Sequence, residues 1–109
     1  MLYLVIAEVK NTPPPASLAS LEQGLATLER LDELTRDGTV LAVGVFAGRM
    51  GMSFTVDVAS NNELHQVVAT LPTFMQAEWQ TIPLVSLADD LAMTRAALEH
   101  LRTVPDTRG

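Results

Sequence analysis

Three short stretches in the second half of the chain decide its fold: SNNELH at residues 60–65, LPTF at residues 71–74 and IPL at residues 82–84. In the first stretch, the Ser60 hydroxyl can accept a hydrogen bond from the backbone N–H of Glu63, and the Glu63 carboxylate can bond back to the start of the turn. Such a capping box predicts the N-terminus of a helix. The three stretches together predict a capped helix that leads through a proline turn into a strand.

The first third of the chain predicts one strand and one long helix. Residues 2–9 (LYLVIAEV) are aliphatic and polar only near the end, which predicts a strand buried on both faces or nearly so. Prolines at 13–15 end it, because proline cannot donate to a strand ladder. A helix follows over residues 17–36, and Gly38 stops it. Leucines spaced by three or four predict one apolar stripe along this helix: Leu18, Leu21, Leu25, Leu28, Leu31 and Leu34.

A hairpin and two further helices complete the pattern. Residues 39–46 and 52–58 are predicted strands joined by a glycine-bounded loop, and the second strand alternates apolar with polar residues. Gly44, inside the first of these strands, predicts a bulge or a close backbone approach. The remaining elements are the capped helix at 60–70, a strand at 77–82 and a helix at 86–102 capped by Ser86.

The order β-α-β-β-α-β plus a C-terminal helix predicts an α+β fold of the ferredoxin-like, split β-α-β type. We expect residues 1–102 to form a single domain that includes the C-terminal helix at 86–102, and residues 103–109 to form a flexible tail. Two helices cover one face of such a sheet. The other face is not uniformly polar here, so we expect a second copy to cover it. The protein would then be a homodimer or larger homo-oligomer, built as a dimeric α/β barrel.

Composition restricts the partners of this protein. The 109 residues carry a net charge of −6 and their basic residues are scattered, which disfavours nucleic acid and anionic membranes as partners. The absence of cysteine excludes disulfides, thiolate metal sites and thiol nucleophiles. No run approaches the ~20 apolar residues of a membrane helix, and no basic region precedes the first strand. We therefore expect a cytoplasmic protein with a small-molecule ligand.

No motif for a cofactor or a metal stands out. His65 and His100 fall on different predicted helices with no carboxylate at ligand spacing, and no serine lies in a Gly-x-Ser-x-Gly turn. Gly48 and Gly51 bound a hairpin and not a phosphate loop, since no helix follows. We expect no cofactor and no metal. An enzyme of this sequence would use general acids and bases beside a shaped apolar pocket.

From about residue 36 to residue 84, with a looser fit over residues 1–9, the chain resembles the muconolactone isomerase family. Most of the shared residues lie at caps, turns and core positions, so the resemblance implies the fold first. It also implies, as an expectation, the cofactor-free movement of a double bond in a small ring. The residues that carry it are Asp37-Gly38-Thr39, Ala47-Gly48, Asp57-Val58, Ser60-Asn61-x-Glu63-Leu64-His65, Leu71-Pro72-x-Phe74 and Pro83-Leu84.

The second strand and the hairpin differ from the family's pattern. The family carries a Trp-Arg-His-Leu-Trp-Arg run where this chain has VLAVGV at residues 40–45, and Tyr and Asn where it has Met50 and Met52. An acid near the end of the first helix is retained in kind through Glu29. Loss of the cationic anchor predicts a substrate other than muconolactone. We expect a larger and less charged molecule, such as an aromatic or polyketide-like ring.

Six residues are candidates for the site. Glu29 and His65 are the candidate proton carriers; the alternative interpretations are an exposed helix carboxylate and a structural hydrogen bond. Arg49 could anchor a substrate carboxylate or be a solvated loop residue. The predicted substrate-binding set is Arg49, Met52, Phe54 and Trp79, for which core or subunit packing is the alternative.

These observations lead to a cofactor-independent, isomerase-like protein that transfers a proton on a small cyclic or aromatic metabolite. Two alternatives stay open. One is a binding or scaffold protein that keeps the barrel without its chemistry. The other is a cofactor-free monooxygenase of aromatic or polyketide substrates, which the single Trp79 and single Tyr3 make less attractive.

Overall fold

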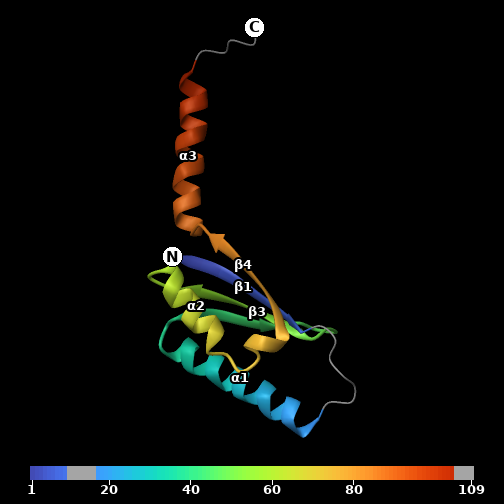
Figure 1. Ribbon diagram of the computed structural model, residues 1–109. Helices are drawn as coiled ribbons and strands as arrows, with labels where there is room; N and C mark the ends of the chain where they lie inside the picture. The colour runs from blue at the N-terminus through green and yellow to red at the C-terminus, as the bar shows by residue number, and fades with distance from the viewer. Residues whose placement is uncertain (10–16, 105–109) are drawn as a thin grey trace.

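The chain folds into one four-stranded antiparallel sheet with two helices on one face and a third helix that projects away from it (Figure 1). The computed structural model describes residues 1–9 and 17–104. The predicted α+β order is confirmed, and the strands lie in the order β2-β3-β1-β4. The proline connection predicted at 13–15 and residues 105–109 of the predicted tail lie outside the described residues. The elements are β1 (Leu2–Val9), α1 (Leu18–Arg36), β2 (Val40–Val45), β3 (Gly51–Asp57), α2 (Asn61–Ala69), the 3₁₀ turn η1 (Phe74–Gln76), β4 (Ala77–Leu84) and α3 (Leu87–Thr103).

Serine side chains cap α1, α2 and α3, which confirms the caps predicted at Ser60 and Ser86 and adds one at Ser17. Ser17, Ser60 and Ser86 each accept a hydrogen bond from the backbone N–H three residues later. At α2 the capping box is complete, because Glu63 Oε2 accepts from the backbone N–H of Ala59 at 2.8 Å. These caps satisfy backbone donors that a helix N-terminus leaves free.

Strand register divides the sheet into two unlike faces. Val5 pairs with Phe54 of β3, and both side chains point to the helices, where they are fully buried. The neighbouring residues Leu4 and Ile6 point to the opposite face and stay half-buried. The prediction that β1 is buried on both faces is therefore wrong for the single chain, since none of the elements within residues 1–9 and 17–104 covers the second side. We call that uncovered side the far face; its apolar residues are Leu2, Leu4, Ile6, Ile82 and Leu84.

The leucines of α1 do not form the single buried stripe that their spacing predicts. Leu31 and Leu34 are buried against the sheet, whereas Leu18, Leu21, Leu25 and Leu28 are 45–74% exposed. Steps of three from Leu25 onward fall short of a full turn, so each step rotates the side chain by about 60° around the axis. The row therefore winds round the helix, and only its last part faces the sheet. Thr27 takes the buried position one turn earlier.

Two glycines near the hairpin differ in what they allow. A Cβ on Gly51 would lie 2.6 Å from the Ala7 carbonyl oxygen and 2.8 Å from the Phe46 ring, so only glycine fits there. A Cβ on Gly44 would meet only Ser53 Oγ, at 3.8 Å. The bulge or close approach predicted at Gly44 is therefore wrong. The register irregularity of β2 lies earlier, between Val40 and Ala42.

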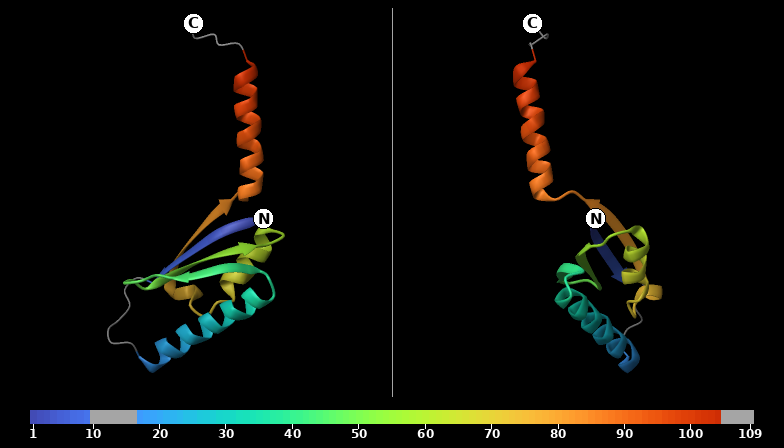
Figure 2. Two further views of the ribbon diagram at one scale, coloured as in Figure 1. Left: turned by 180° about the vertical axis from the view of Figure 1, so that it is seen from behind. Right: turned by 90° about the vertical axis from the view of Figure 1, so that its left-hand side faces the viewer.

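Helix α3 stands clear of the rest of the chain. It leaves the end of β4 and points away from the sheet, on the side opposite α1, in all three views (Figures 1 and 2). None of its residues is buried, and the chain measures 68 × 30 × 21 Å as a result. In proteins, most of the stability of a helix comes from packing of its apolar face and not from intrinsic propensity. No residue of α3 is buried against the described part of the chain, so contacts with another molecule would stabilise it.

Candidate functional site

The far face carries a hollow of about 240 Å³ over the ends of β1 and β4. Register places its residues, because Ile6 pairs with Gln80 and Glu8 pairs with Glu78. Paired residues of antiparallel strands point to the same side of a sheet. The hollow therefore has Ile6 and the Gln80 amide at its floor and two carboxylates at one end. Its lining residues are Ile6, Glu8, Glu78, Trp79 and Gln80.

Arg49 reaches this hollow from the β2–β3 hairpin and forms an ion pair with Glu8. The hairpin is held there because the backbone N–H of Val9 donates to the Met50 carbonyl at 3.1 Å. The Arg49 guanidinium also lies over the Phe46 ring, 5.5 Å from its centroid. The Glu8 side chain is 32% exposed and that of Arg49 is 59% exposed. A partly buried carboxylate and a partly exposed cation thus share one edge of the hollow.

The opposite edge of the floor is small and polar. Ile6 pairs with Ser53 of β3, and Ser53 pairs with Gly44 of β2. Because Gly44 has no side chain, no side chain of β2 projects beside the Ser53 hydroxyl at this position. A flat ring placed on Ile6 would have Gln80 on one side and Ser53 on the other.

A second group of side chains lies on the helix-covered side, around η1. The ring centroids of His65 and Phe74 are 6.4 Å apart in an edge-to-face arrangement, and those of Phe74 and Trp79 are 6.2 Å apart. The indole N–H of Trp79 donates to the Phe74 carbonyl at 2.9 Å. Tyr3 closes this side by donating to Asn61 Oδ1 at 2.7 Å. This aromatic row fastens η1 to the sheet and leaves His65 exposed on α2.

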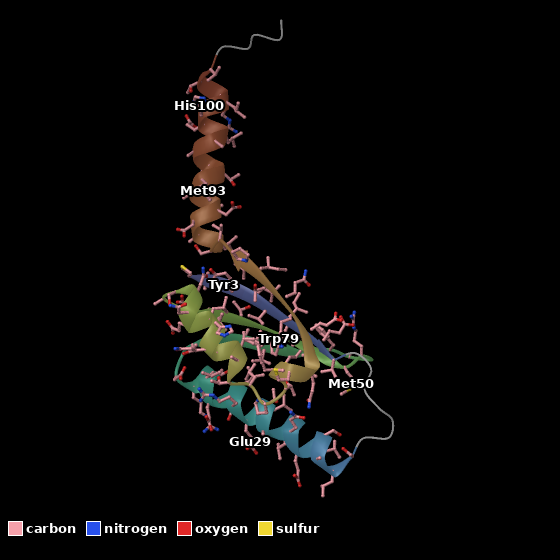
Figure 3. All side chains as sticks on the ribbon, in the orientation of Figure 1. Tyr3, Glu29, Met50, Trp79, Met93 and His100 are labelled. Carbon is pink, nitrogen blue, oxygen red and sulfur yellow. The ribbon has the colours of Figure 1, made fainter. Side chains whose placement is uncertain are left out.

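The residues predicted for the site are spread over several elements. Glu29 is exposed and lies two positions after the buried Thr27, about 200° around α1 from it. The partial burial on which its role as proton shuttle depended is therefore absent in the single chain. Figure 3 shows Glu29 on α1, apart from Trp79 on β4. No hydrogen bond or ion pair joins Glu29, His65 and Arg49 among residues 1–9 and 17–104.

The other predicted binding residues differ in burial. Phe54 is 1% exposed and belongs to the hydrophobic core. Met52 is half-buried and packs against that core. Trp79 is half-buried, packs on the core and also lines the hollow. Of the six predicted residues, Trp79 borders the hollow while its indole packs on the helix-covered side, and Arg49 lies at the hollow through its ion pair with Glu8.

Glu8, Glu78 and Gln80 were not singled out by the sequence. Glu8 and Glu78 are polar residues near strand ends, and Gln80 is a polar residue within β4; such residues usually mark only where a strand meets solvent. The signal that would have found them is register. Counting back from the paired strand ends places Glu8 opposite Glu78.

A second and larger groove, of about 340 Å³, lies between α1 and α2. Its lining includes Arg30, Thr39 and Glu63, and the Glu63 carboxylate is already engaged in capping α2. Within the described ranges, no three His, Cys, Asp or Glu side chains gather as metal ligands would. None of the described helices has the length and apolarity to cross a membrane.

Comparison with known proteins agrees with this fold. A crystal structure of muconolactone isomerase superposes with a TM-score of 0.71 at 24% identity, covering 79% of this chain and 90% of that chain. A 5-chloro-2-hydroxyhydroquinone dehydrochlorinase from Burkholderia phenoliruptrix AC1100, in complex with 2,5-dihydroxybenzoquinone, superposes with a TM-score of 0.62 at 17% identity, covering 82% of this chain and 98% of that one. A comparison with curated proteins gave no match. The family model for muconolactone delta-isomerase matches residues 1–90, and this chain therefore belongs to that family.

Proposed function

We propose that this protein is a cofactor-independent isomerase that moves a proton on a small cyclic or aromatic metabolite bound in the far-face hollow. The observation that carries the proposal is the Glu8–Arg49 pair beside a hollow whose floor is formed by Ile6 and Gln80. Membership in the isomerase family supports the reaction class. The proposed substrate is a ring compound other than muconolactone.

Glu8 is the proposed proton carrier. Its carboxylate would take a proton from a carbon next to a carbonyl group and return it to another carbon of the conjugated system. One C–H bond breaks, another forms and the double bond shifts between them, so no oxidant or reductant is consumed. The partly buried position of Glu8 suits this role better than the exposed position of Glu29.

Arg49 would stabilise the charge that develops during this transfer. Removing a proton next to a carbonyl places negative charge on the carbonyl oxygen, and a guanidinium aimed at that oxygen lowers the barrier. Arg49 is partly exposed, so it can contact a ligand while it stays close to Glu8. Gln80 and Ser53 would orient polar groups on the ring.

The shape of the hollow supports a planar ligand with little charge. Strand β2 has no charged residue and contributes Ala42 and Gly44 on the side of Ser53. A protein of similar fold holds 2,5-dihydroxybenzoquinone, which is a ring of this kind. We further propose that a second copy packs on the far face and closes the hollow, since water exclusion strengthens the electrostatic contacts inside.

The test is a proton-exchange assay in D₂O with a panel of unsaturated lactones and dihydroxylated aromatic acids, followed by NMR and ultraviolet spectroscopy. We expect at least one compound to exchange a ring proton or shift its double bond. Glu8→Gln should lower kcat by about 10²-fold or more. Glu29→Gln and His65→Ala should stay within about threefold of wild type. Full activity in Glu8→Gln, or no turnover of any panel compound, contradicts the proposal.

A binding protein without catalysis is the second candidate. It is favoured by the openness of the hollow, which Glu8 and Arg49 border at only one end. In that case, panel compounds would protect the protein against thermal unfolding but show no proton exchange. Oxygen uptake with a hydroquinone would instead indicate the monooxygenase alternative.

A further inference from the structure

Two helices of this chain carry apolar stripes that the chain itself leaves uncovered. On α1 these are Leu18, Leu21, Leu25 and Leu28. On α3 they are Leu87, Leu91, Leu98 and Leu101, which are 44–83% exposed and complete a stripe with Thr94. Exposed leucines in this number are unusual for a protein that stays a monomer.

Both stripes follow the same seven-residue repeat. The α1 leucines advance by three, four and three residues, and the α3 stripe advances by four, three, four and three. Alternating steps of three and four are the pattern of helices that pack side by side as a coiled coil. Each of the two stripes is therefore suited to packing against another helix.

Charges beside the two stripes are opposite in sign and equal in spacing. Glu22 and Glu29 each follow a stripe leucine on α1 and stand seven residues apart. Arg95 and Arg102 each follow a stripe residue on α3 and also stand seven residues apart. None of these four takes part in an ion pair among the described residues. They occupy the same heptad position, so they face each other when the two helices run antiparallel.

The two helices of one chain cannot meet. Only Val85 and Ser86 join β4 to α3, and α3 points away from the sheet on the side opposite α1 (Figures 1 and 2). We infer that α3 of one copy packs antiparallel on α1 of a second copy. The leucine stripes form the contact, Glu22 pairs with Arg102, and Glu29 pairs with Arg95.

Charge exchange tests this contact. Glu22→Arg/Glu29→Arg and Arg95→Glu/Arg102→Glu should each weaken self-association of the full chain at least about tenfold in sedimentation equilibrium. The variant with all four changes keeps the wild-type net charge of −6 and should recover the association. A wild-type protein that stays monomeric at tens of micromolar overturns the inference. So do reversed variants that associate as wild type, or a fourfold variant that stays dissociated while its circular dichroism matches wild type.

A matched pair of substitutions on α3 distinguishes this contact from non-specific hydrophobic association. Leu98 lies in the stripe and Met93 lies on the other side of the helix, and they are 48% and 55% exposed. Neither is buried in the protomer, so neither aspartate variant should unfold it. Leu98→Asp should dissociate the contact and Met93→Asp should leave it intact; equal effects overturn the inference.

The relative direction of the two helices can be tested separately by disulfide cross-linking, because the chain has no native cysteine. Mixed single-cysteine variants Glu22→Cys and Arg102→Cys should form a disulfide-linked heterodimer under mild oxidation. Glu22→Cys mixed with Arg95→Cys should not. The reverse outcome overturns the antiparallel pairing.

Discussion

The Arg49 guanidinium at the tip of the β2–β3 hairpin is bound to the Glu8 carboxylate near the end of β1, 41 residues away in the sequence. This contact places the charged hairpin beside the far-face hollow, which Glu8 lines. Phe46 supports it from below, with its ring centroid 5.5 Å from the guanidinium carbon. The local conformation of the hairpin and the long-range pairing of the strands are therefore both needed to bring these two residues into contact.

Replacing Arg49 with methionine should affect ligand binding more than stability. The ion pair is partly exposed, and such pairs contribute about 1 kcal/mol or less to the free energy of unfolding. A ligand that uses the guanidinium should bind at least about tenfold more weakly, since a charge-assisted contact is lost. Calorimetric titration with a panel compound that binds the wild type measures this. Arg36→Met, which removes the exposed Asp32 ion pair instead, is the control and should leave binding unchanged.

Glycine at position 51 should be essential for the hairpin. A Cβ there would collide with the Ala7 carbonyl and the Phe46 ring, so Gly51→Ala should lower the free energy of unfolding by about 1–3 kcal/mol. Gly44→Ala is the matched control in the paired strand, where the new methyl group meets only ordinary contact distances. It should change stability by less than about 1 kcal/mol in urea unfolding. Equal losses in the two variants would show that the collision does not govern stability.

The fold was predictable because its signals are local. Serine caps, a proline stop and a left-handed glycine act within a few residues, and Ser60 with Glu63 is the clearest case. The observed β1 ends where it was predicted, and β4 extends two residues beyond the prediction. Local signals of this kind can be recognised in a single sequence, because they do not depend on which elements pack against one another.

The site was less predictable because it depends on register. Glu8 meets Glu78 and Arg49 only after β1 has paired with β4 and the hairpin has closed on Val9. The exposure of the α1 leucines was missed for a different reason. A row of leucines predicts an apolar face, but it does not say whether that face packs on its own sheet or on another subunit.

Stability at low pH should depend on Asp37, the residue after α1. Hydrogen bonds from Thr39, first from its hydroxyl and then from its backbone N–H, hold the pKa of the Asp37 carboxyl below its ordinary value of 3.8. Because the folded pKa is the lower one, the carboxylate stabilises the fold above 3.8, and this contribution disappears as the pH falls through the folded pKa. Asp37→Asn should therefore flatten the fall in urea midpoint between pH 5 and the acid limit.

Thr39→Val provides a second measurement of the same link. Loss of the hydroxyl should move the pKa of Asp37 up toward 3.8, measured by NMR titration of its carboxyl carbon. An unchanged titration would exclude the Thr39 hydroxyl as the cause and leave its backbone N–H.

The N-cap of α2 should support the whole domain. Leu64, Val67 and Val68 of this helix are buried in the core, so fraying at Ser60 weakens their packing. Ser60→Ala should lower the free energy of unfolding by about 1 kcal/mol. Ser60→Asp keeps a capping oxygen and should stay close to wild type in the same urea titration. If the aspartate variant is as unstable as the alanine variant, the cap is not the cause.

The far face should govern self-association independently of α3. Leu4 pairs with Ile82 and Thr55 at the centre of that face, where a second copy is proposed to pack. Leu4→Lys places a charge in this contact and should lower the oligomer mass in light scattering while leaving the helix-side core intact. Met75→Lys is the control, since Met75 is 87% exposed on η1 and belongs neither to the far face nor to the α1 and α3 stripes. Because burial of the hollow would fail with the contact, ligand binding should weaken in Leu4→Lys alone. A Leu4→Lys protein with wild-type mass and wild-type binding would mean that the far face stays open to solvent and that the hollow works without a lid.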